Sequence, residues 1–240
     1  METIPAYVSI LFALVTLATV ILFYRTMKKS TSERTRKRSA IILIGLLIWL
    51  AILAILALSN VYSSNFTSMP PRIFLWGILP NLIVIVLLFI TKDGRKFVDS
   101  LPLASLTNLN TIRIFVELVL WLLFVYKAVP RLMTFEGRNF DILAGITAPL
   151  VAYYGITKGR LSRPMLILWN LVCLGLLLNV VINGLLSTPT PLQVFGLDQP
   201  NKAIFYFPFN WLPSFIVPLI FFGHLVCLRQ LIRKPVLAAA

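Results

Sequence analysis

The sequence predicts an all-α protein, a single integral membrane domain over residues 1–240 that folds as a bundle of seven transmembrane helices. Of its 240 residues, 59% are hydrophobic and only 12% are charged, whereas a soluble domain carries about 25% charged residues. The mean hydropathy is +0.91, and most charged residues stand between long apolar runs. A soluble enzyme, a disordered protein and a secreted disulfide scaffold are therefore excluded.

The first two spans are the clearest. A hydrocarbon core about 30 Å thick is crossed by about 20 apolar helical residues. No charged residue falls between Glu2 and Arg25, or between Arg38 and Arg72. Each of these stretches is long enough for one transmembrane helix.

Breaking or polar residues delimit the other five spans. The third follows Pro70, the fourth contains Glu117 and ends before Pro130, the short fifth begins at Asp141, and the sixth opens with Pro164. Proline is tolerated in the first turn of a helix and disfavoured further inside it. The seven predicted spans cover residues 6–24, 39–59, 73–91, 112–129, 141–157, 164–186 and 213–231.

The distribution of basic residues predicts the orientation. Lys and Arg gather in cytoplasmic loops, so the richer face is assigned to the cytoplasm, with the N-terminus outside and the C-terminus inside. Five basic residues fall on the outer face: Arg72, Lys127, Arg131, Arg138 and Lys202. The inner face has seventeen: Arg25, Lys28, Lys29, Arg34, Arg36, Lys37, Arg38, Lys92, Arg95, Lys96, Arg113, Lys158, Arg160, Arg163, Arg229, Arg233 and Lys234.

Polar side chains within the spans are the candidates for a ligand site, because in lipid such groups usually face the bundle interior or a cavity. Counted at 1.5 Å per residue from the predicted inner ends, six of them lie about 6–15 Å deep. We expect His224 to face the sixth span near Asn170 or Cys173, with Glu117 pointing into the same interior. The six ligand-binding candidates are Asn81, Glu117, Asn170, Cys173, His224 and Cys227.

Two of these residues leave alternatives open. His224, the only histidine, is read as a hydrogen-bonded structural residue, a proton-relay or ligand contact, or a metal ligand with Cys173 and Cys227. Glu117 stands four residues after Arg113, so it forms either an ion pair with Arg113 near the headgroups or a protonatable carboxyl within the bundle.

The predicted outer mouth carries a charge group, which either pairs internally or attracts anionic ligands. We expect Glu136 or Asp141 to pair with Arg131 or Arg138, since unpaired charges at a membrane edge are costly. The members of this group are Lys127, Arg131, Glu136, Arg138 and Asp141.

Two connections are expected to do more than link spans. The outer segment 187–212 is rich in aromatic residues and proline, so it forms either an interfacial belt or a lid over a site. The inner segment 97–111 alternates apolar and polar residues and is expected to lie along the cytoplasmic surface.

Three functional classes fit this reading. The favoured one is a membrane protein that binds or transports a small molecule through a polar site inside the bundle. The alternatives are a structural or accessory subunit without a ligand, and an intramembrane enzyme that uses Glu117 and His224. A retinal protein is excluded because the seventh predicted span contains no lysine.

The expected partners are the lipid bilayer and a small-molecule ligand, in the plasma (inner) membrane of a bacterium. We expect no cofactor and no metal. The net charge of +14 is attributed to membrane orientation and not to nucleic-acid binding, because no nucleic-acid motif accompanies it.

Overall fold

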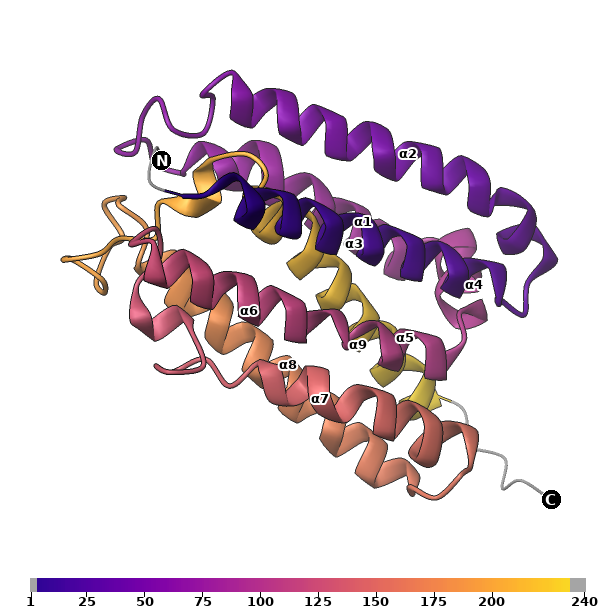
Figure 1. Ribbon diagram of the computed structural model, residues 1–240. Helices are drawn as coiled ribbons and strands as arrows, with labels where there is room; N and C mark the ends of the chain where they lie inside the picture. Colours follow the sequence, from indigo (N-terminus) through magenta and orange to yellow (C-terminus); the bar gives the residue numbers. More distant parts are fainter. Residues whose placement is uncertain (1–3, 234–240) are drawn as a thin grey trace.

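The computed structural model describes residues 4–233, and all the regular elements within that range are helices (Figure 1). Within these residues five helices are long and apolar enough to cross a membrane, or six if one bent pair counts as a single span. The five are α1 (Ala6–Lys28), α2 (Glu33–Leu58), α5 (Leu103–Leu109) with α6 (Ile112–Val125), α8 (Arg163–Leu186), and η5 (Leu212–Ile216) with α9 (Val217–Arg233).

The bent pair consists of η1 (Phe74–Ile78) and α3 (Leu79–Ile90), followed by α4 (Lys92–Ser100) at an angle of 93°. A shorter apolar helix, Ile142–Thr157, is built from α7 (Ile142–Leu150) and η3 (Val151–Thr157). Two short 3-10 turns, η2 (Arg131–Met133) and η4 (Ala203–Phe205), lie in the connections. The structure is therefore an all-helical protein with membrane-spanning composition.

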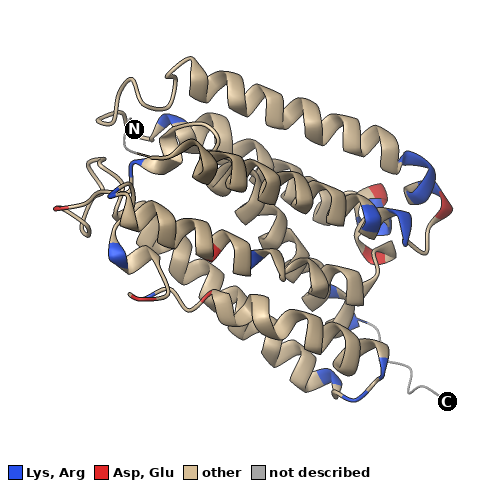
Figure 2. Ribbon diagram, in the orientation of Figure 1, with Lys and Arg blue, Asp and Glu red and all other residues tan. Residues whose placement is uncertain are grey.

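Most Lys and Arg residues lie at one end of the bundle, where α1 ends, α2 and α8 begin, and α9 ends (Figure 2). We call this the basic end. At this end α4 is fastened to α9, because Arg229 donates two hydrogen bonds to the carboxylate of Asp99, at 2.7 and 2.9 Å. Thr91 caps the start of α4 by accepting a hydrogen bond from the backbone N–H of Gly94.

The predicted fourth span, 112–129, is placed too late in the chain. The apolar helix begins at Leu103. The expectation that segment 97–111 lies along the cytoplasmic surface is therefore wrong for its α5 part, although α4 does turn away from α3. Arg113 therefore lies about 15 Å along the helix from Leu103, inside the bundle and not in a basic loop. The sequence misled because Asn110 and Arg113 look like loop residues, yet both are buried.

The connection from α6 to α7 folds back into the bundle. Gly145 lies against α6, where an added Cβ would come within 2.8 Å of the Ile114 side chain and 2.9 Å of its backbone nitrogen. This close approach brings the start of α7 beside the start of α6. Asp141, expected at the outer mouth, is consequently 4% exposed and lies next to Arg113.

The aromatic segment 187–212 folds over the end of the bundle opposite the basic end (Figure 1). Phe205, Phe209 and Trp211 are buried there. The segment is fastened to α2, since the Asn210 side chain donates to the Leu53 carbonyl and the Trp211 indole to the Leu50 carbonyl, both at 3.0 Å. The later part of the segment therefore packs against the bundle at this end.

Candidate functional site

A buried ion pair lies at the centre of the bundle. Arg113, in the first turn of α6, is 2% exposed and faces Asp141 at the start of α7. Its Nε donates to Asp141 Oδ2 at 2.6 Å, and its Nη2 donates to Asp141 Oδ1. This two-pronged contact is the strongest geometry that an arginine and a carboxylate can adopt.

The other donors of Arg113 are also used. Its Nη1 donates to Asn110 Oδ1 at 3.2 Å and lies 3.2 Å from His224 Nε2, while its Nη2 donates to the Cys173 carbonyl at 3.1 Å. A guanidinium has five N–H groups, and these contacts account for all five. Arg113 therefore has no free donor for a ligand.

His224, on α9, has its tautomer fixed by these contacts. A guanidinium only donates, so His224 Nε2 must accept from Arg113 and Nδ1 must carry the proton. Nδ1 then donates to Asn170 Oδ1 at 3.1 Å, and the Asn170 amide donates to the Leu166 carbonyl at 2.9 Å. The structure thus places His224 beside Asn170 on α8, as the sequence predicts.

Glu117 lies one turn beyond Arg113 and is 1% exposed, so it points into the bundle. Of the two alternatives for Glu117, the ion pair with Arg113 is not formed, because Arg113 pairs with Asp141 instead. Both carboxyl oxygens of Glu117 lie 2.7 Å from Asn139 Nδ2. Among the residues the structure describes, no cation lies within 4.0 Å of the Glu117 carboxyl.

Asn139 joins Glu117 to the ion pair. Its Oδ1 accepts from the Asp141 backbone N–H at 3.0 Å, and its Nδ2 also lies 2.9 Å from the Met133 carbonyl. The buried contacts form a continuous chain that we call the polar layer. Its members, in order, are Asn170, His224, Arg113 with Asn110, Asp141, Asn139 and Glu117.

Three of the six ligand-binding candidates lie in this layer, and the other three do not join it through their side chains. Cys173 contributes only its backbone carbonyl. Cys227 contacts the Thr107 hydroxyl at 4.0 Å, and Asn81, on α3, donates to the backbone carbonyls of Gly77 and Ser214. Within residues 4–233 no group of three His, Cys, Asp or Glu residues is placed to hold a metal ion.

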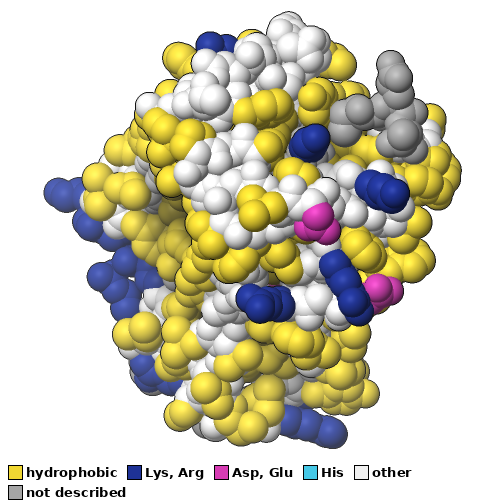
Figure 3. Space-filling view, turned by 90° about the vertical axis from the view of Figure 1, so that its left-hand side faces the viewer, with side chains coloured by type: hydrophobic (Ala, Val, Ile, Leu, Met, Phe, Trp, Pro, Cys, Tyr) yellow, Lys and Arg dark blue, Asp and Glu magenta, His cyan; other side chains and the backbone are white. Residues whose placement is uncertain are grey.

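The outer charge group does not assemble as expected. Glu136 accepts a hydrogen bond from the Trp121 indole at 2.8 Å, and Arg138 lies over the Phe195 ring at 5.9 Å. Neither Glu136 nor Asp141 forms an ion pair with Arg131 or Arg138, so that prediction is wrong. On the end of the bundle seen in Figure 3, a few basic and acidic side chains lie among hydrophobic ones.

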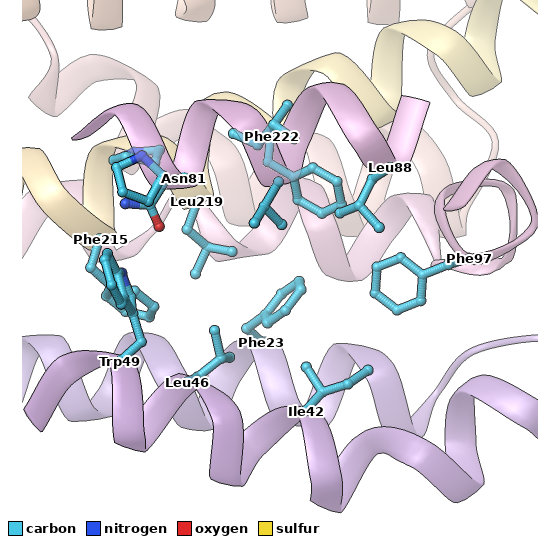
Figure 4. Close-up of a pocket in the computed structure, with 14 residues that line it drawn as sticks. Phe23, Ile42, Leu46, Trp49, Asn81, Leu88, Phe97, Phe215, Leu219 and Phe222 are labelled. Atoms are coloured by element: carbon cyan, nitrogen blue, oxygen red, sulfur yellow. The ribbon is translucent and has the colours of Figure 1, made fainter. Parts of the chain in front are cut away.

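An apolar cavity of about 510 Å³ lies between α2 and the helices α1, α3, α4 and η5–α9 (Figure 4). All but one of its lining side chains are hydrocarbon or aromatic, and the exception is Asn81. In Figure 4, Asn81 and Trp49 lie at one end of the cavity, and Ile42 and Phe97 at the other. This volume falls in the range of small-molecule sites, about 300–1,000 Å³.

The cavity lies beside the part of α2 between Arg36 and Leu50, which makes no hydrogen bond to another described element. At the basic end the hydroxyls of Thr35 and Ser100 lie 3.2 Å apart, and towards the opposite end Leu50 and Leu53 accept the hydrogen bonds from segment 187–212. Within the part of the chain that the structure covers, no hydrogen bond joins α2 to α3. The middle of α2 therefore stands away from α3.

Asn81 has both a structural contact and a free atom. Pro218 has no N–H to offer the Ser214 carbonyl four residues earlier, and Asn81 Nδ2 donates to that carbonyl at 2.8 Å and to the Gly77 carbonyl at 2.6 Å. Its Oδ1 accepts no hydrogen bond from any described residue. In Figure 4 this oxygen points into the cavity.

A second cavity, of about 360 Å³, lies near the basic end between α1, α5 and α7–η3. Arg25 and Lys29 are among its lining residues, together with Ser105 and Asn108. Its chemistry therefore differs from that of the apolar cavity, because it offers cations to a ligand.

Fold and site together define an all-helical membrane-type protein with a buried ionic layer and a separate apolar cavity. Residues 70–232 match the family described as a domain of unknown function, DUF8737, and the protein belongs to this family. The match includes the whole polar layer and the α3 and α9 walls of the cavity, but neither α1 nor α2. No curated protein and no solved structure matches the chain.

Proposed function

We propose that this protein binds a small molecule from the lipid phase in the apolar cavity beside α2. We also propose that the polar layer holds together the other half of the bundle, which consists of helices α6 to α9. The proposal includes seven membrane-embedded segments, with the N-terminus outside and the C-terminus in the cytoplasm of a bacterial plasma membrane. The short helix Ile142–Thr157 supplies the seventh segment.

The charge bias supports this orientation after one correction. With Arg113 removed from the predicted inner loops, the sequence assigns sixteen basic residues to the inner face and five to the outer face. The positive-inside rule counts Lys and Arg near the ends of spans, so the bias remains strong. A cysteine introduced at Ser64 should react with an impermeant thiol reagent added outside intact cells, and one at Ser32 should not. The reverse pattern would overturn the orientation.

The observation that carries the binding proposal is the free amide oxygen of Asn81 in an otherwise apolar cavity. A ligand site is expected to be largely apolar with a few polar groups that orient the ligand. The polar layer lacks this character, because its central residue, Arg113, has all five donors occupied. Of the six predicted ligand-binding residues, Asn81 is thus the one that we retain as a ligand contact.

The two alternatives gain less support. An intramembrane enzyme would bring Glu117 and His224 to one reacting centre, yet no hydrogen bond joins these side chains and each has other partners. An accessory subunit would account for the polar layer as a structural feature. It would not account for a cavity of ligand size that contains an unsatisfied acceptor.

Photo-crosslinking with a diazirine derivative of hexadecane tests cavity binding directly. Purified protein in lipid nanodiscs should be labelled mainly on cavity-lining peptides of α2, α3 and α9. Val84→Trp, which fills the cavity mouth, should remove most of this labelling. Val86→Trp is the matched control, because both valines are on α3 and are 54% and 55% exposed, but only Val84 lines the cavity.

Uniform labelling of all lipid-facing helices, unchanged by Val84→Trp, would overturn the proposed function. Equal loss of labelling in the two variants would do the same, because it would place the probe on the outer surface of α3.

A further inference from the structure

We infer that the cavity takes an uncharged amphiphile with a hydroxyl head, an alcohol whose oxygen is bound by Asn81 and whose apolar body extends along α3 towards Phe97. This inference rests on the proposed function and specifies its ligand class. It is carried by the chemistry of the polar atoms at one end of the cavity and by the absence of charge along its described lining.

The free atom of Asn81 determines what the head of the ligand must supply. An amide oxygen only accepts hydrogen bonds, so the ligand must donate one. The amide nitrogen cannot exchange places with this oxygen, because it already donates to two backbone carbonyls, those of Gly77 and Ser214. A head that only accepts, such as an ether, would face the Asn81 oxygen without a partner.

Trp49 supplies the complementary group at the same end of the cavity (Figure 4). Its indole Nε1 is shielded from solvent and has no hydrogen-bond partner among the described residues. An indole N–H only donates. A hydroxyl is both donor and acceptor, so it matches the free oxygen of Asn81 and the partnerless N–H of Trp49 better than a group that only donates or only accepts.

The charge of the ligand is determined by the walls. The fourteen lining residues include no charged side chain, and an ionised head at this depth would be costly without a counter-ion. A fatty acid or a phospholipid headgroup is therefore a poor fit. Such an anion would be better served by the second cavity, which is lined by Arg25 and Lys29.

The body of the ligand is apolar and meets mainly aromatic rings. Phe215 lies near the polar end, Phe23 and Phe222 lie along the cavity, and Phe97 closes the far end (Figure 4). The entrance is beside Val84, which is more than half exposed, on the flank where α2 stands away from α3. The ligand can therefore enter from the membrane without crossing water.

Competition against the diazirine–hexadecane probe tests the inference in the intact protein. The competitors are hexadecanol, hexadecyl methyl ether and hexadecanoate, which share one chain and differ in the head. Hexadecanol should compete about two- to tenfold more strongly than the ether, the range that one net hydrogen bond provides. Hexadecanoate should compete more weakly than hexadecanol, and any binding of it should survive Val84→Trp.

If all three compounds competed equally and Val84→Trp still blocked the labelling, the inference of an alcohol ligand would be overturned. The proposed function would remain standing. This result would identify the occupant as an ordinary acyl chain. Stronger competition by hexadecanoate than by hexadecanol, lost in Val84→Trp, would also overturn the inference. Failure of Val84→Trp to affect the labelling at all would overturn the proposed function itself.

Discussion

Two asparagines, Asn139 in the polar layer and Asn81 at the cavity, show how differently the two halves of the bundle are built. Both amides donate to buried carbonyls, but the oxygen of Asn139 accepts from the Asp141 backbone whereas that of Asn81 accepts from no described residue. In a membrane an unsatisfied polar atom is costly. A side-chain amide with all its hydrogen-bonding groups in use therefore indicates a structural role. An amide with a free oxygen at a cavity indicates a place for a ligand.

The difference follows from how helices associate in lipid. Lipid tails are as apolar as leucine, so helices are held together by close packing and by interhelical hydrogen bonds. Where bonds are dense, as from Asn170 to Glu117, helices α6 to α9 are drawn together. Where such bonds are lacking, as between Arg36 and Leu50 of α2, the helix leaves room for a cavity.

The largest expected effect is the loss of the central ion pair. Asp141→Ala would leave the Arg113 guanidinium buried without its counter-ion, and breaking a buried pair in this way costs about 3–5 kcal/mol. The free energy of unfolding, measured by denaturant titration in mixed micelles, should fall by that amount. The same substitution at the exposed Asp198 is the control and should have little effect.

A double variant sharpens this comparison. Arg113→Met combined with Asp141→Leu removes both charges, so it should be more stable than Asp141→Ala alone. If Asp141→Ala were as stable as Asp198→Ala, the ion pair would not hold this half of the bundle together.

The next effect concerns the link between Glu117 and the ion pair. Asn139→Ala removes the donor to Glu117 and Met133 and the acceptor of the Asp141 N–H, so about 2–4 kcal/mol should be lost. Glu117→Gln keeps a carbonyl oxygen that can accept from Asn139 and should cost less than about 1 kcal/mol. Thermal unfolding of the two variants side by side checks this order, and a larger loss in Glu117→Gln would contradict it.

His224→Ala should have an intermediate effect. It leaves one Arg113 N–H and the Asn170 oxygen without partners, at an expected cost of about 1–3 kcal/mol. If the layer is structural, any ligand binding should change only in step with stability. Loss of probe labelling in a His224→Ala protein that remains folded would instead make His224 a ligand contact.

The smallest expected effect is at Tyr62, which lies in the loop after α2. Its side chain is 1% exposed, and its hydroxyl is buried without a partner among the described residues. Tyr62→Phe should therefore leave stability at pH 7 unchanged or raise it by up to about 1 kcal/mol. A loss greater than this would reveal a hydrogen bond at the hydroxyl.

The same variant should change the response to alkaline pH. Burial raises the pKa of Tyr62 from its ordinary value of 10 to about 12, so between these values the unfolded chain loses a proton that the folded chain keeps. The contribution of Tyr62 to stability is complete below pH 10 and is lost as the pH rises towards 12. Unfolding measured across this range should show a steeper loss of stability in the wild type than in Tyr62→Phe.

Part of the polar layer could be predicted from the sequence. The equal depth of His224 and Asn170 on consecutive antiparallel helices predicts that their side chains lie close together, and that contact is present. Arg113 was misplaced because Lys and Arg usually mark the ends of spans. The spacing of Asn110 and Arg113, three residues apart, is the signal that would have placed both on one inward face of a helix beginning at Leu103.

Other features depend on distances that no sequence pattern encodes. Asp141 reaches Arg113 only because a loop folds back into the bundle and Gly145 allows close contact with α6. The cavity depends on where α2 stands, and the sequence of α2 is almost uniformly apolar from residue 40 onward. In such a helix the side that faces a cavity and the side that faces lipid look alike.

The division between a structural polar layer and a ligand-binding cavity is tested most directly by thermal unfolding with and without hexadecanol. In wild-type protein hexadecanol should raise the Tm, because a ligand that binds only the folded state stabilises it. His224→Ala should have a lower starting Tm but keep this rise, whereas Val84→Trp should keep the starting Tm and lose the rise. A rise that is lost in His224→Ala and kept in Val84→Trp would contradict the account.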